Sequence, residues 1–349
     1  MVWIPEQTRR SIASSEGRKM ERMFSCSARL VPMLDRFRKY SESKINISSI
    51  MKKIIVVGSS NTDMVVKSSH LPGPGETVLG GNFLMTQGGK GANQAVAVKR
   101  MGGNLIFVAR LGNDLFGDQT IEVLAKEGIC TEYITRDKMH PSGVALINVD
   151  EKAENTIVVA SGANLLLDES DIDKIEGEMS EGGILLMQLE SPIATVEYAA
   201  KKAFEKGMKV ILNPAPAQHL PESLYNYLYM ITPNRIETEM LTGIKINNDS
   251  DIALAAEKLS KKGVKNVIIT LGSKGCFVRE GNNSYSVDSF KVKAVDSTAA
   301  GDTFNGALCV GIAENMELKQ AVKMASQASS IAVTRMGAQS SIPHRSELV

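Results

Sequence analysis

The chain has 349 residues, of which 43% are hydrophobic, and a formal net charge of +1 at pH 7. This length suits one large α/β domain or two modest ones, with enough apolar residues for a buried core. No apolar run approaches the roughly 18 residues of a membrane span, and residues 51–349 carry 30 basic against 34 acidic side chains, so neither a membrane nor a nucleic-acid partner is expected.

Residues 1–50 lack the patterning of the rest. They hold ten Lys/Arg and five Asp/Glu, with no strand pattern and no long helical pattern. The absence of an apolar h-region argues against a secretory signal, and acids such as Glu6 and Asp35 argue against a transit peptide. We expect an extension that is disordered or not native to the protein, with Met51 as a plausible natural start. An organelle-targeting segment is the remaining alternative.

From Met51 onward, short apolar runs alternate with helical patterns. Helices are predicted around 91–101 and 119–127, and strands lie in the runs 53–58, 104–112, 184–190, 209–216, 229–234 and 266–272. Short continuous apolar runs are typical of strands buried on both faces, so the alternation predicts βαβ units around a parallel sheet. The four cysteines (Cys26, Cys130, Cys276 and Cys309) show no metal-binding spacing. They indicate reduced, mostly buried thiols and hence a cytoplasmic protein.

Two regions break this rhythm. Residues 64–86 and 143–160 show alternating strands and turns without helices. They predict a small separate sheet laid over one end of the main domain. Ligands of open α/β sheets bind beyond the carboxyl ends of the strands, so such a lid would exclude water from the site.

The stretch "GSSNTDMVV" places Asn61 and Asp63 after the first strand. A carboxylate that accepts from two adjacent hydroxyls, beside an amide that donates and accepts, suits sugar recognition. An Asx turn is the alternative.

The stretch "TQGGKGANQAVAVKRMG" (86–102) combines glycines with Lys90 and Asn93 before an amphipathic helix. It matches neither the P-loop pattern nor GxGxxG. Glycines allow a ligand to approach the backbone, and Lys90, which we place in the loop, can donate to hydroxyls together with Asn93. A flexible turn with a solvated lysine is the alternative.

In "TPNRIETEMLTG" (232–243), Asn234 begins a helix and Glu237 follows three residues later, which is capping-box spacing. The functional alternative is that the pair organises Mg²⁺ and phosphate, because Mg²⁺ keeps waters and meets only one or two carboxylates. The stretch "ITLGSKG" (269–275) is a strand with a glycine-containing turn that could meet a nucleotide or form a plain hairpin.

The stretch "STAAGDTFNGAL" (297–308) places small residues and an acid where a helix should begin, near Gly301. Small residues leave backbone N–H groups uncovered, and a helix start adds its unpaired N–H groups and positive end. These predict an anion hole for a phosphate, with Asp302 close enough to take a proton from an attacking hydroxyl. The alternative is a simple helix cap.

These five stretches occur together in an order that resembles the ribokinase branch of the PfkB-type carbohydrate kinases, over essentially all of 51–349. "GGKGANQA" and "DSTAAGDTFNGAL" match the two signature regions, and "MQLESP", "NPAPA" and "VTRMGAQSSIP" are similar to the ribokinase members in particular. The resemblance implies a doubly wound, mostly parallel α/β sheet flanked by helices, with a small β-sheet lid. It also implies ATP-dependent phosphorylation of D-ribose at O5 by a homodimer whose lid strands pair between subunits.

The resemblance also implies roles for matching positions. Asp302 would be the catalytic base, and the anion hole would comprise Ala299, Ala300 and Gly301. Ribose would be held by Asn61, Asp63, Gly89, Lys90, Gly91, Asn93, Glu190 and Asp302. ATP would contact Asn234, Thr270, Leu271, Gly272, Ser273, Lys274, Gly275, Gly301 and Ser326, the last standing where the family often has Asn or His.

Two metal ions are implied in addition. Glu237 would help to place Mg²⁺ through water. An activating K⁺ would be held beside the anion hole, several ligands being backbone carbonyls, by Asp296, Thr298, Ala332, Arg335, Gly337 and Ser341. The alternatives are a kinase for deoxyribose or fructose and a non-catalytic sugar-binding protein, and a Rossmann oxidoreductase is disfavoured because "VVGSSNTD" lacks GxGxxG.

Overall fold

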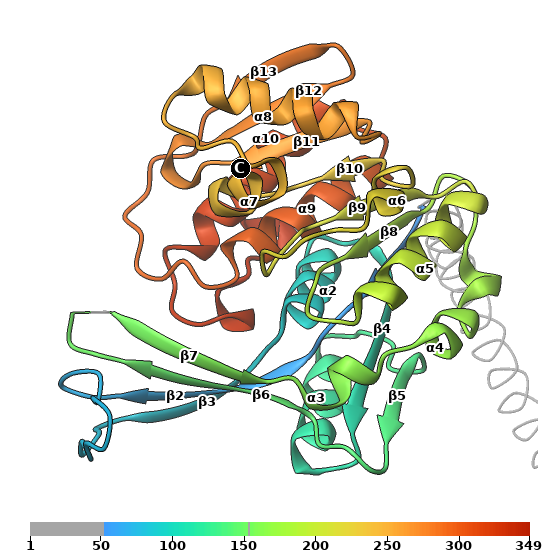
Figure 1. Cartoon of the computed structure of the whole chain (residues 1–349). Coiled ribbons are helices and arrows are strands. Elements are labelled where there is room, and N and C mark those ends of the chain that lie inside the picture. Colours follow the sequence, from blue (N-terminus) through green and yellow to red (C-terminus); the bar gives the residue numbers. More distant parts are fainter. Residues whose placement is uncertain (1–51, 153) are drawn as a thin grey trace, which may run out of the picture. The chain divides into compact units, whose positions relative to one another are not determined.

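The computed structural model describes residues 52–152 and 154–349, so the expectations for residues 1–50 lie outside the described residues. Within this part, one sheet has the strand order β13-β12-β11-β10-β9-β8-β1-β4-β5 (Figure 1). The strands from β5 to β11 in this order run parallel, whereas β12 pairs antiparallel with β11 and β13 pairs antiparallel with β12. Their bounds are β1 Lys53–Val57, β4 Asn104–Gly112, β5 Ile134–Asp137, β8 Ile184–Met187, β9 Lys209–Leu212, β10 Met230–Ile231, β11 Asn266–Thr270, β12 Cys276–Glu280 and β13 Asn283–Val287.

Helices cover both faces of this sheet because its central strands are apolar on both sides. Side chains of β1 alternate between two cores: Ile54 and Val56 enter one, Ile55 and Val57 the other. The first core contains α2 (Lys90–Arg100), α3 (Leu115–Lys126), α9 (Ala300–Ala313) and α10 (Leu318–Ala332). The second contains α4 (Glu169–Asp173), α5 (Ile193–Glu205), α6 (Glu222–Tyr225), α7 (Arg235–Thr242) and α8 (Asp249–Lys261). The predicted α/β class with a mostly parallel, doubly wound sheet is confirmed.

A second sheet is formed by β2 (Asn61–Lys67), β3 (Phe83–Gly88), β6 (Gly143–Val149) and β7 (Asn155–Ala160), in the order β3-β2-β6-β7 (Figure 1). Its strands overlap the two regions without helical pattern. Asp63 pairs with Thr86 on one side and Ala145 on the other. Because successive strand side chains alternate between faces, Asn61, Asp63 and Ala145 share one face of the second sheet.

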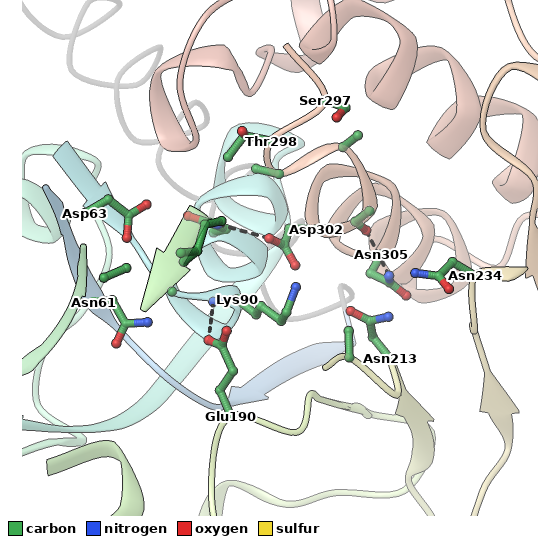
Figure 2. Close-up of a pocket in the computed structure, with 18 of the residues that line it drawn as sticks. Asn61, Asp63, Lys90, Glu190, Asn213, Asn234, Ser297, Thr298, Asp302 and Asn305 are labelled. Atoms are coloured by element: carbon green, nitrogen blue, oxygen red, sulfur yellow. Dashed lines mark hydrogen bonds between the residues drawn. The ribbon is translucent and has the colours of Figure 1, made fainter. Parts of the chain in front are cut away.

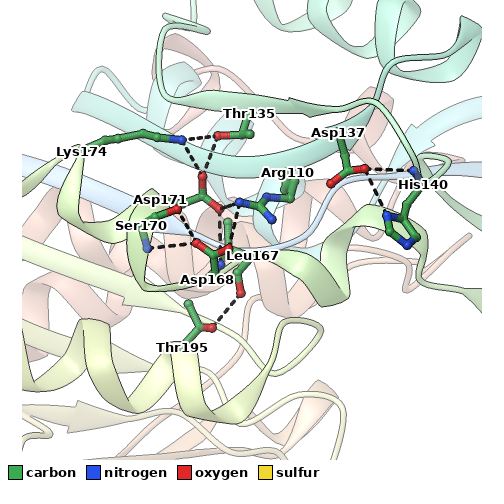
Figure 3. A network of polar contacts seen from close by, with 10 residues as sticks. All are labelled: Arg110, Thr135, Asp137, His140, Leu167, Asp168, Ser170, Asp171, Lys174 and Thr195. Carbon is green, nitrogen blue, oxygen red and sulfur yellow. Dashed lines mark hydrogen bonds and ion pairs between the residues drawn. The ribbon is translucent and has the colours of Figure 1, made fainter.

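A buried ion-pair network fixes the segment that follows this sheet (Figure 3). The Asp171 carboxylate, 1% exposed, lies 2.8 Å from Arg110 of β4 and 2.9 Å from Lys174, and it accepts a 2.6 Å hydrogen bond from Thr135 of β5. Removing the partners of a buried charge strongly destabilises a folded protein. The network therefore holds α4, which follows the 3₁₀ turn Gly162–Leu166, against β4 and β5 of the main sheet.

The described residues contain no helix long and apolar enough to cross a membrane. Cys276 and Cys309 are buried, whereas Cys130 is exposed. The expectation of mostly buried thiols therefore holds for two of the three cysteines that the structure describes.

Candidate active site

Two cavities lie at the carboxyl edge of the main sheet. The first, of about 400 Å³, is lined by the start of α2, the start of α9, the ends of strands, and the second sheet (Figure 2). The second, of about 590 Å³, extends from β11 and β12 to α10. Both are lined by Ser297, Ala300 and Gly301. The predicted anion hole therefore stands where two ligand-sized spaces meet.

The start of α9 is open to a ligand. Ala299, the residue before the helix, has a left-handed backbone (φ 58°) and no side chain caps this end. In the part of the chain that is described, the N–H groups of Gly301 and Asp302 have no hydrogen-bond acceptor. A Cβ added at Gly301 would meet no heavy atom within 4 Å. Unpaired amides at a positive helix end beside empty space are the elements of an anion site.

Asp302 is 6% exposed and lies in the first turn of α9. Its Oδ2 accepts a 3.0 Å hydrogen bond from Asn93 and its Oδ1 a 2.9 Å hydrogen bond from Gln94, both on α2. A carboxylate held next to unpaired amides can accept a proton from a hydroxyl whose oxygen attacks an anion bound by those amides.

Four further charged side chains line the cavity around this carboxylate: Lys90, Glu190, Glu237 and Asp63. Figure 2 shows Lys90 between Glu190 and Asp302. Burial lowers the pKa of Lys90, but attraction to Asp302, Glu190 and Glu237 outweighs it, so the net shift is upward. Burial, with repulsion from Glu190 and Asp302, raises the pKa of Asp63 to about 7. The cavity therefore combines Lys90, which stays positively charged, with the Asp63 carboxylate, which titrates near neutral pH.

The second sheet presents Asn61 and Asp63 to the cavity. Asn61 Oδ1 accepts a 2.7 Å hydrogen bond from Asn164 of the 3₁₀ turn, and no described residue accepts from its NH₂ group. The Asp63 carboxylate likewise accepts no hydrogen bond from a described residue, and Asn93 Oδ1 is buried without a partner among them. The expected alternative of an Asx turn is wrong, since Asn61 and Asp63 lie within β2.

The glycine-rich segment differs in detail from expectation. Lys90 is the first residue of α2 rather than part of a loop, and Gly89 precedes it with φ 85°. A Cβ at Gly88 would lie 2.1 Å from the Asp63 carboxylate, so glycine here makes room for that side chain. The backbone N–H of Lys90 donates to Glu190 at 3.0 Å, whereas Gly91 lines neither cavity.

The Asn234–Glu237 capping box is confirmed. Asn234 Oδ1 accepts from the Glu237 N–H, and Glu237 accepts in return from the Asn234 N–H and NH₂ groups. Burial raises the pKa of Glu237, against the hydrogen bond from Asn234 and the charge of Lys90. Among the residues described, no three His, Cys, Asp or Glu side chains form a metal-binding group. A single carboxylate such as that of Glu237 fits the coordination preference of Mg²⁺. This ion binds one or two carboxylates and completes its coordination shell with water and phosphate oxygens.

The second cavity receives part of the predicted nucleotide segment. After β11 the chain makes a 3₁₀ turn at Gly272–Lys274. The cavity is lined by Asn234, Thr270, Gly272, Ser273, Gly275 and Ser326, but Leu271 and Lys274 do not line it. Residues that were not predicted complete its wall: Cys276, Phe290, Val292 and Phe304.

Part of the predicted potassium set meets beside the start of α9. The Asp296 carboxylate accepts hydrogen bonds from the Gly337 N–H at 2.9 Å and from the Thr298 N–H at 2.9 Å. The carbonyl of Ala332 accepts from the Arg335 N–H. Ser341 is buried and donates to Ala338, and the Arg335 guanidinium pairs with Glu347. These bonds join Asp296, Thr298 and Gly337, and the Asp296 carboxylate and Thr298 hydroxyl among them are oxygen ligands that fit a monovalent cation.

The sequence patterns missed the polar side chains that support the site. Gln188, Asn213 and Thr232 follow β8, β9 and β10 and are buried. A polar residue directly after a buried parallel strand was the available signal, because carboxyl ends of strands build the ligand site. An apolar wall was also missed; it consists of Ala145, Ile147, Ile157 and Val159.

Comparison with known proteins agrees with this geometry. Residues 51–345 match the family model described as pfkB family carbohydrate kinase. The chain is 43% identical over 296 residues to the ribokinase of Haemophilus influenzae, covering 85% of this chain and 97% of that protein. It is 35% identical over 291 residues to the deoxyribokinase of Salmonella typhi, covering 83% and 95%.

The fold has solved counterparts. The ribokinase of Arabidopsis thaliana, solved in complex with ribose and ATP, superposes with a TM-score of 0.79 at 30% identity, covering 85% of this chain and 97% of that one. The ribokinase of Thermotoga maritima gives a TM-score of 0.77 at 41% identity, covering 85% and 98%.

Proposed function

The chain belongs to the pfkB family of carbohydrate kinases and phosphorylates ribose with ATP, and we propose that it does so at O5 of the sugar with Asp302 as the general base. The observation that carries this proposal is the meeting of two cavities at Gly301, where unpaired amides and a carboxylate converge. Ribose in the first cavity and ATP in the second would bring hydroxyl and γ-phosphoryl group together there.

The proposed reaction is an in-line transfer. Asp302 takes the proton of the sugar hydroxyl while the hydroxyl oxygen attacks phosphorus and ADP leaves. The charge that develops on the phosphoryl oxygens is stabilised by the Gly301 and Asp302 amides, with Ala299 and Ala300 shaping the turn, and by Lys90. In phosphoryl transfer such positioning and electrostatic stabilisation supply most of the rate.

The other walls of the first cavity suit a small sugar. Asp63 and the Asn93 carbonyl oxygen are acceptors without a partner among the described residues, and the free Asn61 NH₂ group is a donor. We assign ribose hydroxyls to these groups and to Glu190, Gly89 and Lys90. The apolar wall of the second sheet would cover the ring and exclude water, which is the lid role expected for this sheet.

We assign ATP to the second cavity and Mg²⁺ to the space beside Glu237. When bound, Mg²⁺ would neutralise charge on the nucleotide phosphates. Glu237 would orient its water shell, since its own carboxylate oxygens already accept from Asn234. A K⁺ ion held around Asp296 would fix the loop before α9, because Asp296 and Thr298 lie directly before the anion hole.

We further propose a homodimer formed through the second sheet. Phe83 and Val158 are 63% and 65% exposed there, and with the exposed Leu146 they share the face of the sheet opposite Asp63. Exposed apolar side chains gathered on one face often mark a protein–protein contact, and a second copy has the matching chemistry. Sedimentation at micromolar concentration should give the mass of two chains, and a monomer would exclude this arrangement. We expect the protein to work in the cytoplasm.

The function is tested by measuring ADP release with ribose, deoxyribose and fructose at equal ATP, with and without K⁺. We expect the highest kcat/KM with ribose and a stimulation by K⁺. A higher kcat/KM with deoxyribose would assign that sugar instead. Ribose binding without ADP release would identify a sugar-binding protein and exclude a kinase.

The raised pKa of Asp63 predicts pH-dependent sugar binding. The ionised carboxylate accepts at both oxygens, whereas protonation turns one of them into a donor, so KM for ribose should rise as pH falls below about 7. Initial rates at saturating ATP between about pH 6 and pH 8 check this. The control is KM for ATP, which should change less, and a ribose KM that is flat over this range would contradict the assignment of Asp63.

The same shift predicts that Asp63→Asn stabilises the unliganded protein. The pKa of Asp63 in the folded protein, about 7, exceeds its ordinary value of 3.8, so burying the ionised group opposes folding. This penalty is absent below about pH 4, grows to about pH 7, and then stays near its maximum of about 4 kcal/mol. The gain in unfolding free energy of the variant should therefore increase over this range. Equal stabilities at pH 8 would contradict the burial argument.

A further inference from the structure

Three buried carboxamides connect Asp302 to the ends of β8 and β9. Gln94 Nε2 donates to Asp302 Oδ1 at 2.9 Å and to Asn213 Oδ1 at 3.0 Å. Gln188 Nε2 donates to Gln94 Oε1. Gln94 is 0% and Gln188 1% exposed, and neither lines either of the two cavities described above.

The direction of each hydrogen bond follows from Asp302. An ionised carboxylate can only accept, so the Gln94 amide must turn its NH₂ group toward Asp302. Its oxygen then faces Gln188, which must donate in turn. The orientation of Gln188 is thereby coupled to that of the Asp302 carboxylate through one intermediate amide.

The buried position of the Gln188 side chain is unfavourable for the stability of the fold. Its Oε1 is buried and has no partner among the residues that the structure describes, and an unpaired buried acceptor opposes folding. A Cβ at Gly58 would lie 2.0 Å from this oxygen, so the amide fits only because residue 58 is glycine. A buried amide with an unpaired oxygen contributes little to stability, and its donor end points at Gln94.

We propose that Gln94 and Gln188 are positioning residues that fix the rotation of the Asp302 carboxylate, with Gln188 acting through Gln94. Asn93 holds Oδ2 and Gln94 holds Oδ1, so the carboxylate plane cannot turn without breaking one of these bonds. The free lone pairs then face the sugar hydroxyl. This inference rests on the proposed role of Asp302 as the base.

The test is Gln188→Glu, which keeps the size of the side chain and removes its donor. The ionised carboxylate of this variant can only accept, so the Gln94 amide turns its NH₂ group toward residue 188 and its oxygen toward Asp302. The hydrogen bond from Gln94 to Asp302 is then lost. We expect kcat to fall about 10–100-fold, with little change in KM for ribose. Protonation of the introduced carboxylate restores the donor, so the kcat ratio of variant to wild type should rise as pH is lowered from about 9 to about 6.

Two further variants separate positioning from packing. Gly58→Ala displaces the Gln188 amide without adding a charge and should also lower kcat. Asn266 is the first residue of β11, at the end of the strand away from the two cavities. Asn266→Asp also removes a buried donor, in this case the one that binds the Tyr229 carbonyl. It should lower Tm and leave kcat unchanged.

Wild-type kcat in Gln188→Glu across the pH range would overturn the inference, as would equal kcat losses in Gln188→Glu and Asn266→Asp. Wild-type protein that releases no ADP with ribose would instead refute the proposed function. The two failures are therefore distinguishable in the same set of assays.

Discussion

Asp302→Asn should lower kcat for ribose phosphorylation by at least about 100-fold, because loss of general base catalysis typically reduces rates by ~10²–10⁴. The asparagine keeps the size of the side chain but cannot take up the proton. Ribose affinity should change little, because Asp63, Asn61 and Glu190 remain in the first cavity. Coupled ADP release gives kcat, and calorimetry gives the dissociation constant of ribose.

The control for this variant is Asp118→Asn, which removes an exposed acid from the first turn of α3. Its activity should equal that of the wild type. Near-normal turnover of Asp302→Asn would remove Asp302 from the role of base. Loss of ribose binding together with turnover would instead indicate a binding role.

Gly301→Ala should reduce kcat by about 100-fold or more without destabilising the protein. The added methyl group meets no heavy atom within 4 Å, and alanine is the better helix former by about 1 kcal/mol. It would stand where the transferring phosphoryl group must approach the amides, and loss of one such hydrogen bond reduces rates by about 10²–10³.

Thermal unfolding and ADP release on the same preparation check this prediction. We expect a Tm equal to or above that of the wild type together with the loss of turnover. Gly177→Ala, at an exposed position with similar free space, should leave both quantities unchanged. An active Gly301→Ala would show that phosphate binds elsewhere.

The sequence predicts the main sheet well because its strands are continuous apolar runs that need burial on both faces. The run 53–58, for example, becomes β1, whose residues Ile54 to Val56 are completely buried. Segment ends were less predictable. Lys90 was placed in a loop but begins α2, because Gly89 adopts φ 85° and allows the helix to start directly after it.

For the site, the residues in signature stretches were predictable, whereas their supports were not. Gln94 occupies an amphipathic helix, where a buried glutamine cannot be told from an exposed one by spacing alone. Its role depends on β8 and β9 lying beside α2, which is a property of the tertiary structure. The exposure of the apolar residues of the second sheet could not be predicted either. Alternation along a strand does not say which face of the sheet another part of the protein covers.

The left-handed backbone at Ala299 has a consequence for binding. A residue with a Cβ in this conformation is strained by roughly 1–2 kcal/mol, and here the surrounding fold keeps it so. Folding of the chain offsets this strain before any nucleotide binds. The amides at the start of α9 are therefore preorganised, and in their proposed role they would stabilise the transition state without reorganisation.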